Sequence, residues 1–232
     1  MSELPPEWPV DFSDFSRKLW RTVAPYTMTS KERVVSLEAA VRYLCAYVIT
    51  GDMVECGVAA GGSVMAMAVT LLDLGKSDRG LWLYDTFKGM PALTEHDIGC
   101  FDTPAMKLFN KRHNQEGEWI RFSVEDVKTN VLSTGYPEAQ FHFVQGKVEE
   151  SLLKTVPERI ALLRLDTDWY ESTKSEMETL FPRVAPGGLI LLDYNFRWMG
   201  SRKAVDEYIA QNGIRIFGTR IDDHFVIGVK QN

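Results

Sequence analysis

The chain has 232 residues, 45% of them hydrophobic and 25% charged, with a formal net charge of -6 at pH 7. That length and composition fit one soluble globular domain, and no apolar run reaches the roughly 18 residues that a transmembrane helix needs. The acidic balance argues against a nucleic-acid partner, and three cysteines without CxxC spacing (Cys45, Cys56 and Cys100) exclude a disulfide framework and favour the reducing cytoplasm.

The first predicted elements are an N-terminal arm and a long helix. Residues 1–28 are expected to form a loosely structured arm, which is acidic, proline-bearing and without the basic and apolar regions of a secretion signal. Thr29 and Glu32 form a capping-box pattern, which predicts a helix from there to just before Gly51. Its apolar residues recur at helical spacing: Val34, Leu37, Val41, Leu44 and Val48.

Beyond Gly51 the chain alternates between short apolar runs and helical stretches. The seven predicted strands are 53–56, 81–84, 141–144, 161–165, 189–192, 214–217 and 225–229. The helices predicted between them are 63–74, 123–134, 173–183 and 201–212. This alternation predicts one α/β domain over 29–232, a doubly wound and mostly parallel sheet covered on both faces. Residues 94–120 form a polar insertion without a strand pattern, and we expect a lid or loop there.

Four of the predicted strands end in an acidic residue or run straight into one: Glu55, Asp85, Asp166 and Asp193. An aspartate just before a helix is most often an N-cap, so each one alone is a weak signal. In open α/β sheets, however, ligands bind beyond the carboxyl ends of the strands. Four acids that converge on that edge favour a ligand carrying hydroxyls or positive charge, or a hard metal ion.

The first predicted strand leads into a glycine turn, residues 57–63, where the backbone can approach a ligand closely. The turn lacks the lysine of a phosphate loop, and Ala59 stands where a dinucleotide fingerprint has its second glycine. Asp85, after the second strand, is placed to accept hydrogen bonds from both hydroxyls of a ribose. These features indicate a nucleoside cofactor without phosphates, of which S-adenosylmethionine is the common example. A nicotinamide-dependent oxidoreductase is the alternative that the turn disfavours.

Several separated motifs, in order along the chain, resemble one family. They are Val54-Glu55-Cys56-Gly57-Val58 with Gly61-Gly62-Ser63, then residues 84–91, 163–173, 186–188 and 200–207. From about Tyr26 to the C-terminus the chain is similar to the macrocin, mycinamicin and novobiocin-type sugar O-methyltransferases. The resemblance implies the class I methyltransferase fold, whose seventh strand is antiparallel, and a magnesium-assisted methyl transfer from S-adenosylmethionine to a sugar hydroxyl.

The resemblance also implies roles for particular residues. Those implied to hold the cofactor are Glu55, Gly57, Gly61, Ser63, Asp85 and Asp166. The implied metal ligands are Asp166 and Asp193, and Asp168 resembles the proposed general base of the family. The family has paired aspartates at the second metal position, whereas this chain has Asp193-Tyr194-Asn195. One expected metal carboxylate is therefore missing, and Asn195 or Tyr194 is predicted near its place.

The implied chemistry needs these groups because a sugar hydroxyl titrates far above pH 7 and must lose its proton as it attacks the methyl group. A divalent ion on the attacking oxygen lowers that barrier, and a nearby carboxylate takes the proton. Magnesium prefers oxygen ligands, and an amide oxygen in place of a carboxylate predicts weaker binding. We expect a homo-oligomer, a dimer, that acts on a small-molecule or saccharide acceptor.

Other interpretations remain open. A phenolic or catechol-type acceptor suits the same fold, and a scaffold protein that has lost its chemistry would explain the missing aspartate. Histidines in the predicted lid, His96 and His113, are candidates for substrate contact because loops carry function more often than cores do. The aromatic residues near the acidic site could stack on a sugar ring, although large aromatics more often belong to the core: Trp169, Tyr170 and Trp198.

Overall fold

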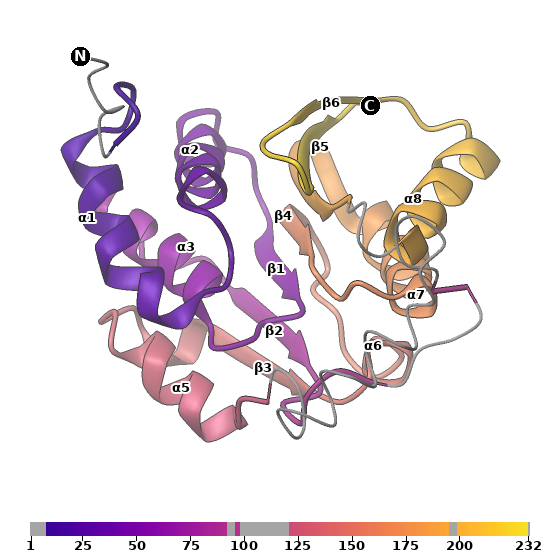
Figure 1. The fold of residues 1–232 in the computed structure, drawn as a ribbon, viewed down its shortest axis with the longest axis horizontal. Coiled ribbons are helices and arrows are strands. Elements are labelled where there is room, and N and C mark those ends of the chain that lie inside the picture. The colour runs from indigo at the N-terminus through magenta and orange to yellow at the C-terminus, as the bar shows by residue number, and fades with distance from the viewer. Residues whose placement is uncertain (1–7, 92–95, 98–120, 195–198, 232) are drawn as a thin grey trace, which may run out of the picture.

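All seven predicted strands lie side by side in one sheet (Figure 1). The computed structural model describes residues 8–91, 96–97, 121–194 and 199–231. The strands are β1 (Asp52–Cys56), β2 (Leu81–Asp85), β3 (Phe141–Gln145), β4 (Ile160–Leu165), β5 (Val184–Asp193), β6 (Ile216–Arg220) and β7 (Phe225–Lys230). Their order is β3-β2-β1-β4-β5-β7-β6, with β7 antiparallel to both neighbours and the other pairs parallel. The predicted fold class and its antiparallel last strand are confirmed.

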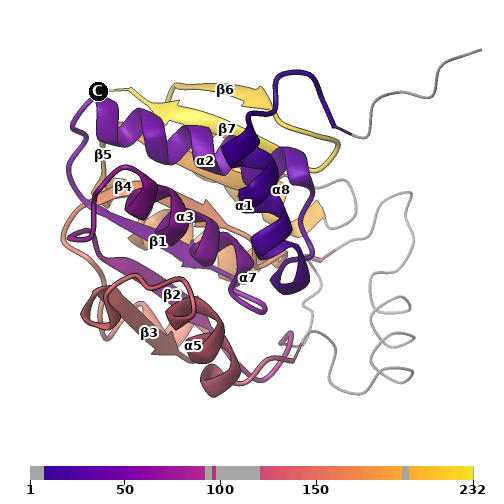
Figure 2. The ribbon, with the colours of Figure 1, turned by 90° about the vertical axis from the view of Figure 1, so that its left-hand side faces the viewer.

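Helices cover both faces of the sheet (Figure 2). One face carries α1 (Asp14–Val23), α2 (Lys31–Ala46), α3 (Gly62–Asp73) and α5 (Val124–Leu132). The other carries α6 (Val148–Ser151), α7 (Tyr170–Thr179) and α8 (Met199–Asn212). None of the described helices is both long and apolar enough to cross a membrane.

The core consists of two apolar layers, one on each face of the sheet. In β4 every residue is buried, and Leu162 packs into the layer of α2 and α3 while Leu163 packs into the layer of α7. A strand covered on both faces is a continuous apolar run and does not alternate, which is how β4 stands out in the sequence. Cys56 is fully buried, as predicted.

The N-terminal segment is more regular than its sequence predicted. The expectation of a loosely structured arm is wrong for residues 14–26, which form α1 and the 3-10 turn η1 (Ala24–Tyr26). Ser13 caps α1 by accepting the Ser16 N–H at 3.0 Å, and Leu19 is buried in the core. The Ser16 hydroxyl donates to Glu38 of α2 at 2.6 Å. Amphipathic spacing therefore outweighs the prolines that precede the helix.

The beginnings of two other helices also differ from prediction. Ser30, one residue after the predicted Thr29, caps α2 by accepting the Arg33 N–H at 3.2 Å. Helix α7 begins at Tyr170 rather than at 173, because its first N–H is bonded at 2.8 Å to Asp97, a residue remote in sequence. By contrast, Ser123 forms the predicted cap of α5.

Helix α2 ends in a strained turn that predicts a stabilising substitution. Val48 has φ +54 and is 77% exposed, while its N–H and that of Ile49 return to the carbonyls of Cys45 and Leu44. This hydrogen-bond pattern normally has glycine at the left-handed position. A β-branched residue there is strained, so Val48→Gly should raise the free energy of unfolding by about 1 kcal/mol. Urea unfolding checks this.

The matched control for this substitution is Val10→Gly, because Val10 is 91% exposed and outside the positive-φ residues of the described chain. That change should not stabilise the protein. Equal shifts in the urea midpoint for the two variants would contradict the strain at Val48.

Candidate active site

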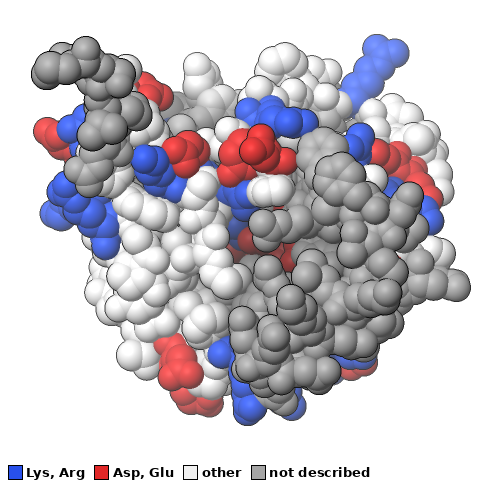
Figure 3. All heavy atoms as spheres, in the orientation of Figure 1, with Lys and Arg blue, Asp and Glu red and all other residues white. Residues whose placement is uncertain are grey.

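An open pocket of about 730 Å³, counted with the part that faces solvent, lies beyond the carboxyl ends of the strands. Figure 3 shows acidic and basic side chains gathered around a central hollow on this side of the molecule. The described residues that line the pocket are Met28, Gly57, Ala59, Tyr84, Asp85, Thr86, Gly89, Met90, Pro91, Gly146, Lys147, Val148, Glu149, Asp166, Thr167, Asp168 and Ser172.

The glycine turn between β1 and α3 is built so that the backbone itself faces the pocket. Gly57 has φ +82, and a Cβ there would lie 2.2 Å from the carbonyl oxygen of Asp166. Gly61 has φ +94 and precedes the first turn of α3. Ala59 also has a positive φ, +48, which is unusual for a residue with a side chain. Strain of this kind gathers at ligand-binding turns.

Asp85, at the end of β2, holds two loops of the pocket together. Its Oδ2 accepts the Val58 N–H at 2.7 Å and the Ala59 N–H at 3.3 Å, and its Oδ1 accepts the Phe87 N–H at 2.8 Å. The Thr86 hydroxyl is a fourth, longer neighbour, 3.4 Å from Oδ1. The residue therefore shapes the glycine turn as well as facing the pocket.

Glu55 lies behind the pocket rather than in its wall. It is 1% exposed and forms an ion pair with Arg164, which also bonds Asp166 at 2.8 Å. Burial raises the pKa of Glu55 to about 7, while Arg164 acts to lower it. Among the described residues, Gly61 and Ser63 also stand outside the lining, whereas Gly57, Asp85 and Asp166 are part of it. The direct cofactor contacts predicted for all six residues remain predictions.

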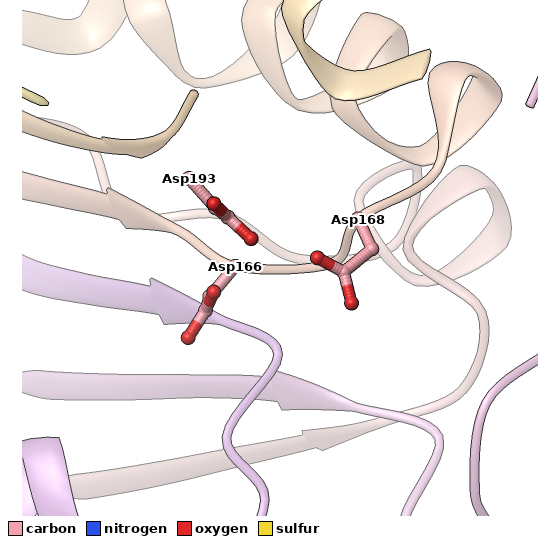
Figure 4. A group of neighbouring side chains, drawn as sticks. All are labelled: Asp166, Asp168 and Asp193. Carbon is pink, nitrogen blue, oxygen red and sulfur yellow. The ribbon is translucent and has the colours of Figure 1, made fainter. Parts of the chain in front are cut away.

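Three aspartates meet at the ends of β4 and β5 (Figure 4). Asp166, Asp168 and Asp193 each offer a carboxylate oxygen, and these oxygens all lie within 4.8 Å of one another. Burial and then Asp193 raise the pKa of Asp168 well above its ordinary value, against a smaller opposite effect of Arg33. The family resemblance implies proton transfer for Asp168 and metal binding for the other two, with Asp166 also near the cofactor, and the structure brings all three into one cluster.

The residues after Asp193 follow a different course. The Tyr194 hydroxyl donates to Asp206 of α8, and the Arg202 guanidinium lies 4.9 Å from the centre of its ring. Tyr194 thus packs against α8. The predicted ligand Asn195 lies outside the described residues, as do Cys100, His113, Trp198 and most of the predicted lid.

The aromatic residues near the cluster have structural contacts. Trp169 is 2% exposed and donates its indole N–H to the Pro91 carbonyl at 3.1 Å, and the Tyr170 hydroxyl donates to Glu207 at 2.6 Å. The His96 ring packs against the Tyr170 ring with ring centres 4.6 Å apart and a tilt of 48° between the ring planes. The described pocket lining does not include Trp169, Tyr170 or His96. The prediction that they belong to the core holds for Trp169 and Tyr170.

Sequence reasoning missed the part of the pocket that follows β3. Lys147 and Glu149 line it there, and Glu149 accepts the Ser172 hydroxyl at 2.8 Å. Met28 adds a wall from the N-terminal segment. The available signal was positional: β3 is a parallel strand, so the residues after it must reach the same edge as Asp85.

Comparison with known proteins identifies the family. The family model of Macrocin-O-methyltransferase (TylF) matches residues 16–228. The chain is 33% identical over 195 residues to the 8-demethyl-8-(2,3-dimethoxy-alpha-L-rhamnosyl)-tetracenomycin-C 4'-O-methyltransferase of Streptomyces olivaceus, covering 84% of this chain and 71% of that protein. It is 30% identical over 193 residues to the mycinamicin III 3''-O-methyltransferase of Micromonospora griseorubida, covering 83% and 73%.

A solved structure agrees with the family match. The structure of the O-methyltransferase NovP is 27% identical and has a TM-score of 0.78, covering 89% of this chain and 83% of that one. The chain is therefore an O-methyltransferase and belongs to the macrocin O-methyltransferase (TylF) family.

Proposed function

We propose that this protein transfers a methyl group from S-adenosylmethionine to a hydroxyl group of a sugar or saccharide. The observation that carries the proposal is one pocket that joins the glycine turn, Asp85 and the three-aspartate cluster. The names of the relatives support the acceptor class, since one is named for a rhamnosyl substrate and methylates its 4' position.

The cofactor would lie along the carboxyl edge of β1 and β2. Its ribose hydroxyls would donate to Asp85. The cofactor would also lie against the backbone of the turn at Gly57, where a side chain would clash with the Asp166 backbone. Glu55 and Arg164 support this wall from behind and keep Asp166 at its edge. The positive sulfonium is matched by the negative charge of the neighbouring cluster.

The acceptor hydroxyl would meet the cofactor at the aspartate cluster. There the proposed role of Asp168 is to accept the hydroxyl proton while the oxygen attacks the methyl carbon. One C–O bond forms and the bond from sulfur to that methyl carbon breaks, which gives a methyl ether and S-adenosylhomocysteine. Asp168 has φ +68, a backbone that aspartate adopts more readily than most residues, and this directs its carboxylate into the pocket.

The cluster also fits a hard divalent ion. Three carboxylates with oxygens within 4.8 Å repel one another unless a cation or a proton is shared among them. In this proposal Asp166 and Asp193 would hold the ion together with the predicted ligand Asn195, which lies outside the described residues, and a bound Mg²⁺ would supply Lewis acidity toward the acceptor oxygen.

The direct test of the proposed function is transfer of labelled methyl groups to a panel of deoxysugar glycosides, with a catechol as comparison. We expect product from the glycosides. Transfer to the catechol alone would overturn the sugar assignment, and no transfer to any acceptor by protein that binds the cofactor product would overturn the activity.

The proposal predicts a loss of cofactor affinity in Asp85→Ala. The change removes charge-assisted hydrogen bonds to the ribose and loosens the turn at Val58, at a cost of about 1.5–3 kcal/mol, or a roughly 10- to 150-fold rise in Kd for S-adenosylhomocysteine. Calorimetry measures it, with exposed Asp78 changed to Ala as the control. Equal Kd values for Asp85→Ala and wild type would rule out the ribose contact.

The metal assignment predicts that a chelator abolishes methyl transfer and that added Mg²⁺ restores it. Restoration should fail in Asp193→Asn and succeed in Asp223→Asn, which changes an exposed acid in the turn between β6 and β7. The loss of one carboxylate ligand predicts that high Mg²⁺ concentrations are needed. Activity that is indifferent to both treatments would contradict the metal role.

A further inference from the structure

Asp168 reaches the pocket from a strained turn. The Trp169 N–H donates to the Thr167 carbonyl at 2.9 Å, which encloses Asp168 with its φ of +68. A three-residue turn with a positive φ at its centre is rare and strained. Such a turn persists only when its neighbours hold it from both sides. After the turn, the chain is held in place by the burial of Trp169 and by its hydrogen bond to the Pro91 carbonyl.

Before the turn, the chain is held in place by a buried acid of α7. Glu176 is 0% exposed, and its Oε2 accepts the hydroxyl of Thr167 at 3.2 Å. The Cys56 side chain faces the same carboxyl group, and the Cys56 carbonyl accepts the Asp166 N–H at 2.9 Å. Glu176 therefore lies directly behind the segment that carries two aspartates of the cluster, without itself lining the pocket.

We propose that Glu176 is a positioning residue, which fixes Thr167 through their hydrogen bond and thereby holds the Asp168 carboxylate in the pocket. The inference rests on the proposed function, because the group being positioned is the proposed proton acceptor. It goes beyond that function by assigning a role to a residue outside the described pocket lining.

Burying an acid between a helix and a sheet costs free energy that an apolar residue would not cost. Burial disfavours the ionised form and raises the pKa of Glu176 to about 8, so the group is neutral at pH 7. An apolar residue of the same size would fill this volume without a polar group. What the apolar residue cannot do is accept the Thr167 hydroxyl. The hydrogen bond is thus the property that distinguishes Glu176 from a packing residue.

Three variants of the full-length protein separate positioning from packing. Glu176→Gln keeps a neutral acceptor of nearly the same shape, Glu176→Met keeps the volume and loses the acceptor, and Thr167→Val removes the donor. In the two that lose the bond, hydrogen exchange of the Trp169 amide should be at least about tenfold faster than in wild type, because the turn opens more often. In Glu176→Gln it should remain within about twofold.

Turnover follows from the same geometry. With S-adenosylmethionine and the best glycoside of the panel, kcat should fall roughly 10- to 100-fold in Glu176→Met and Thr167→Val. In Glu176→Met, which changes a residue outside the pocket lining, the Kd for S-adenosylhomocysteine should not change. The double variant should be no slower than either single one, since both break one bond. Glu176→Gln should restore kcat. A packing role would instead make kcat follow the melting temperature.

The outcomes are distinguishable from failure of the proposed function. Unchanged Trp169 exchange in both Glu176→Met and Thr167→Val overturns the inference, whether or not any acceptor is methylated. Faster exchange with unchanged kcat overturns it as well. A wild type that methylates no acceptor overturns the proposed function, while the exchange data still decide whether Glu176 holds the turn.

Discussion

Asp168→Asn should lower kcat for methyl transfer by about 10²–10⁴-fold, because an amide cannot take up the proton of the sugar hydroxyl at neutral pH. The fold should survive, since asparagine adopts the positive φ of this position as readily as aspartate does. The cofactor pocket is otherwise unchanged, so the Kd for S-adenosylhomocysteine should stay near the wild-type value. Steady-state kinetics and calorimetry on the same preparations measure both quantities.

The control for this substitution is Asp223→Asn, which removes an equal charge from an exposed position. It should leave kcat unchanged. A residual kcat in Asp168→Asn above a tenth of the wild-type value would show that another group takes the proton. A parallel collapse of cofactor affinity would instead assign Asp168 to binding.

Glu176→Gln should raise the free energy of unfolding by about 3 kcal/mol at pH 7, and by almost nothing at pH 4. Burial raises the pKa of Glu176 from its ordinary 4.5 to about 8 in the folded protein. At a pH between these two pKa values, the unfolded chain has lost a proton that the folded chain keeps. Rising pH therefore favours unfolding by about 1.4 kcal/mol per pH unit. Glutamine has no proton to lose, and the variant escapes this penalty.

Urea unfolding from pH 4 to 8 measures the effect. The difference between wild type and Glu176→Gln should grow steadily from about pH 4.5 and level off near pH 8. Glu178→Gln, an exposed acid two residues along the same helix, is the control and should produce no such divergence. A constant difference at every pH would mean that Glu176 ionises normally in the folded protein.

The sequence predicted those parts of the site that depend on strand ends. Asp85, Asp166 and Asp193 follow apolar runs, and parallel strands carry the residues at their carboxyl ends to one edge. The glycine turn was visible for the same reason, since positive φ and close approach leave glycine as the main choice. Local patterns of this kind need no knowledge of distant residues.

What the sequence could not predict depends on contacts between distant segments. Glu176 looks like an ordinary helix acid, and only the packing of α7 on β1 and β4 buries it beside Cys56 and Thr167. The start of α7 at Tyr170 depends on Asp97, which lies 73 residues away in the chain. Likewise, Glu55 has the same spacing whether it faces a ligand or an arginine, and the partner Arg164 decides between the two.

The measurement that tests the central claim most directly is calorimetric titration of the full chain with S-adenosylhomocysteine and, separately, with NAD. The proposed ribose acceptor, and a turn at residues 57–63 that lacks the phosphate-binding patterns, predict binding of S-adenosylhomocysteine with a micromolar-order Kd, roughly -8 kcal/mol, and none of NAD. Binding of NAD by folded protein that fails to bind S-adenosylhomocysteine would contradict the account.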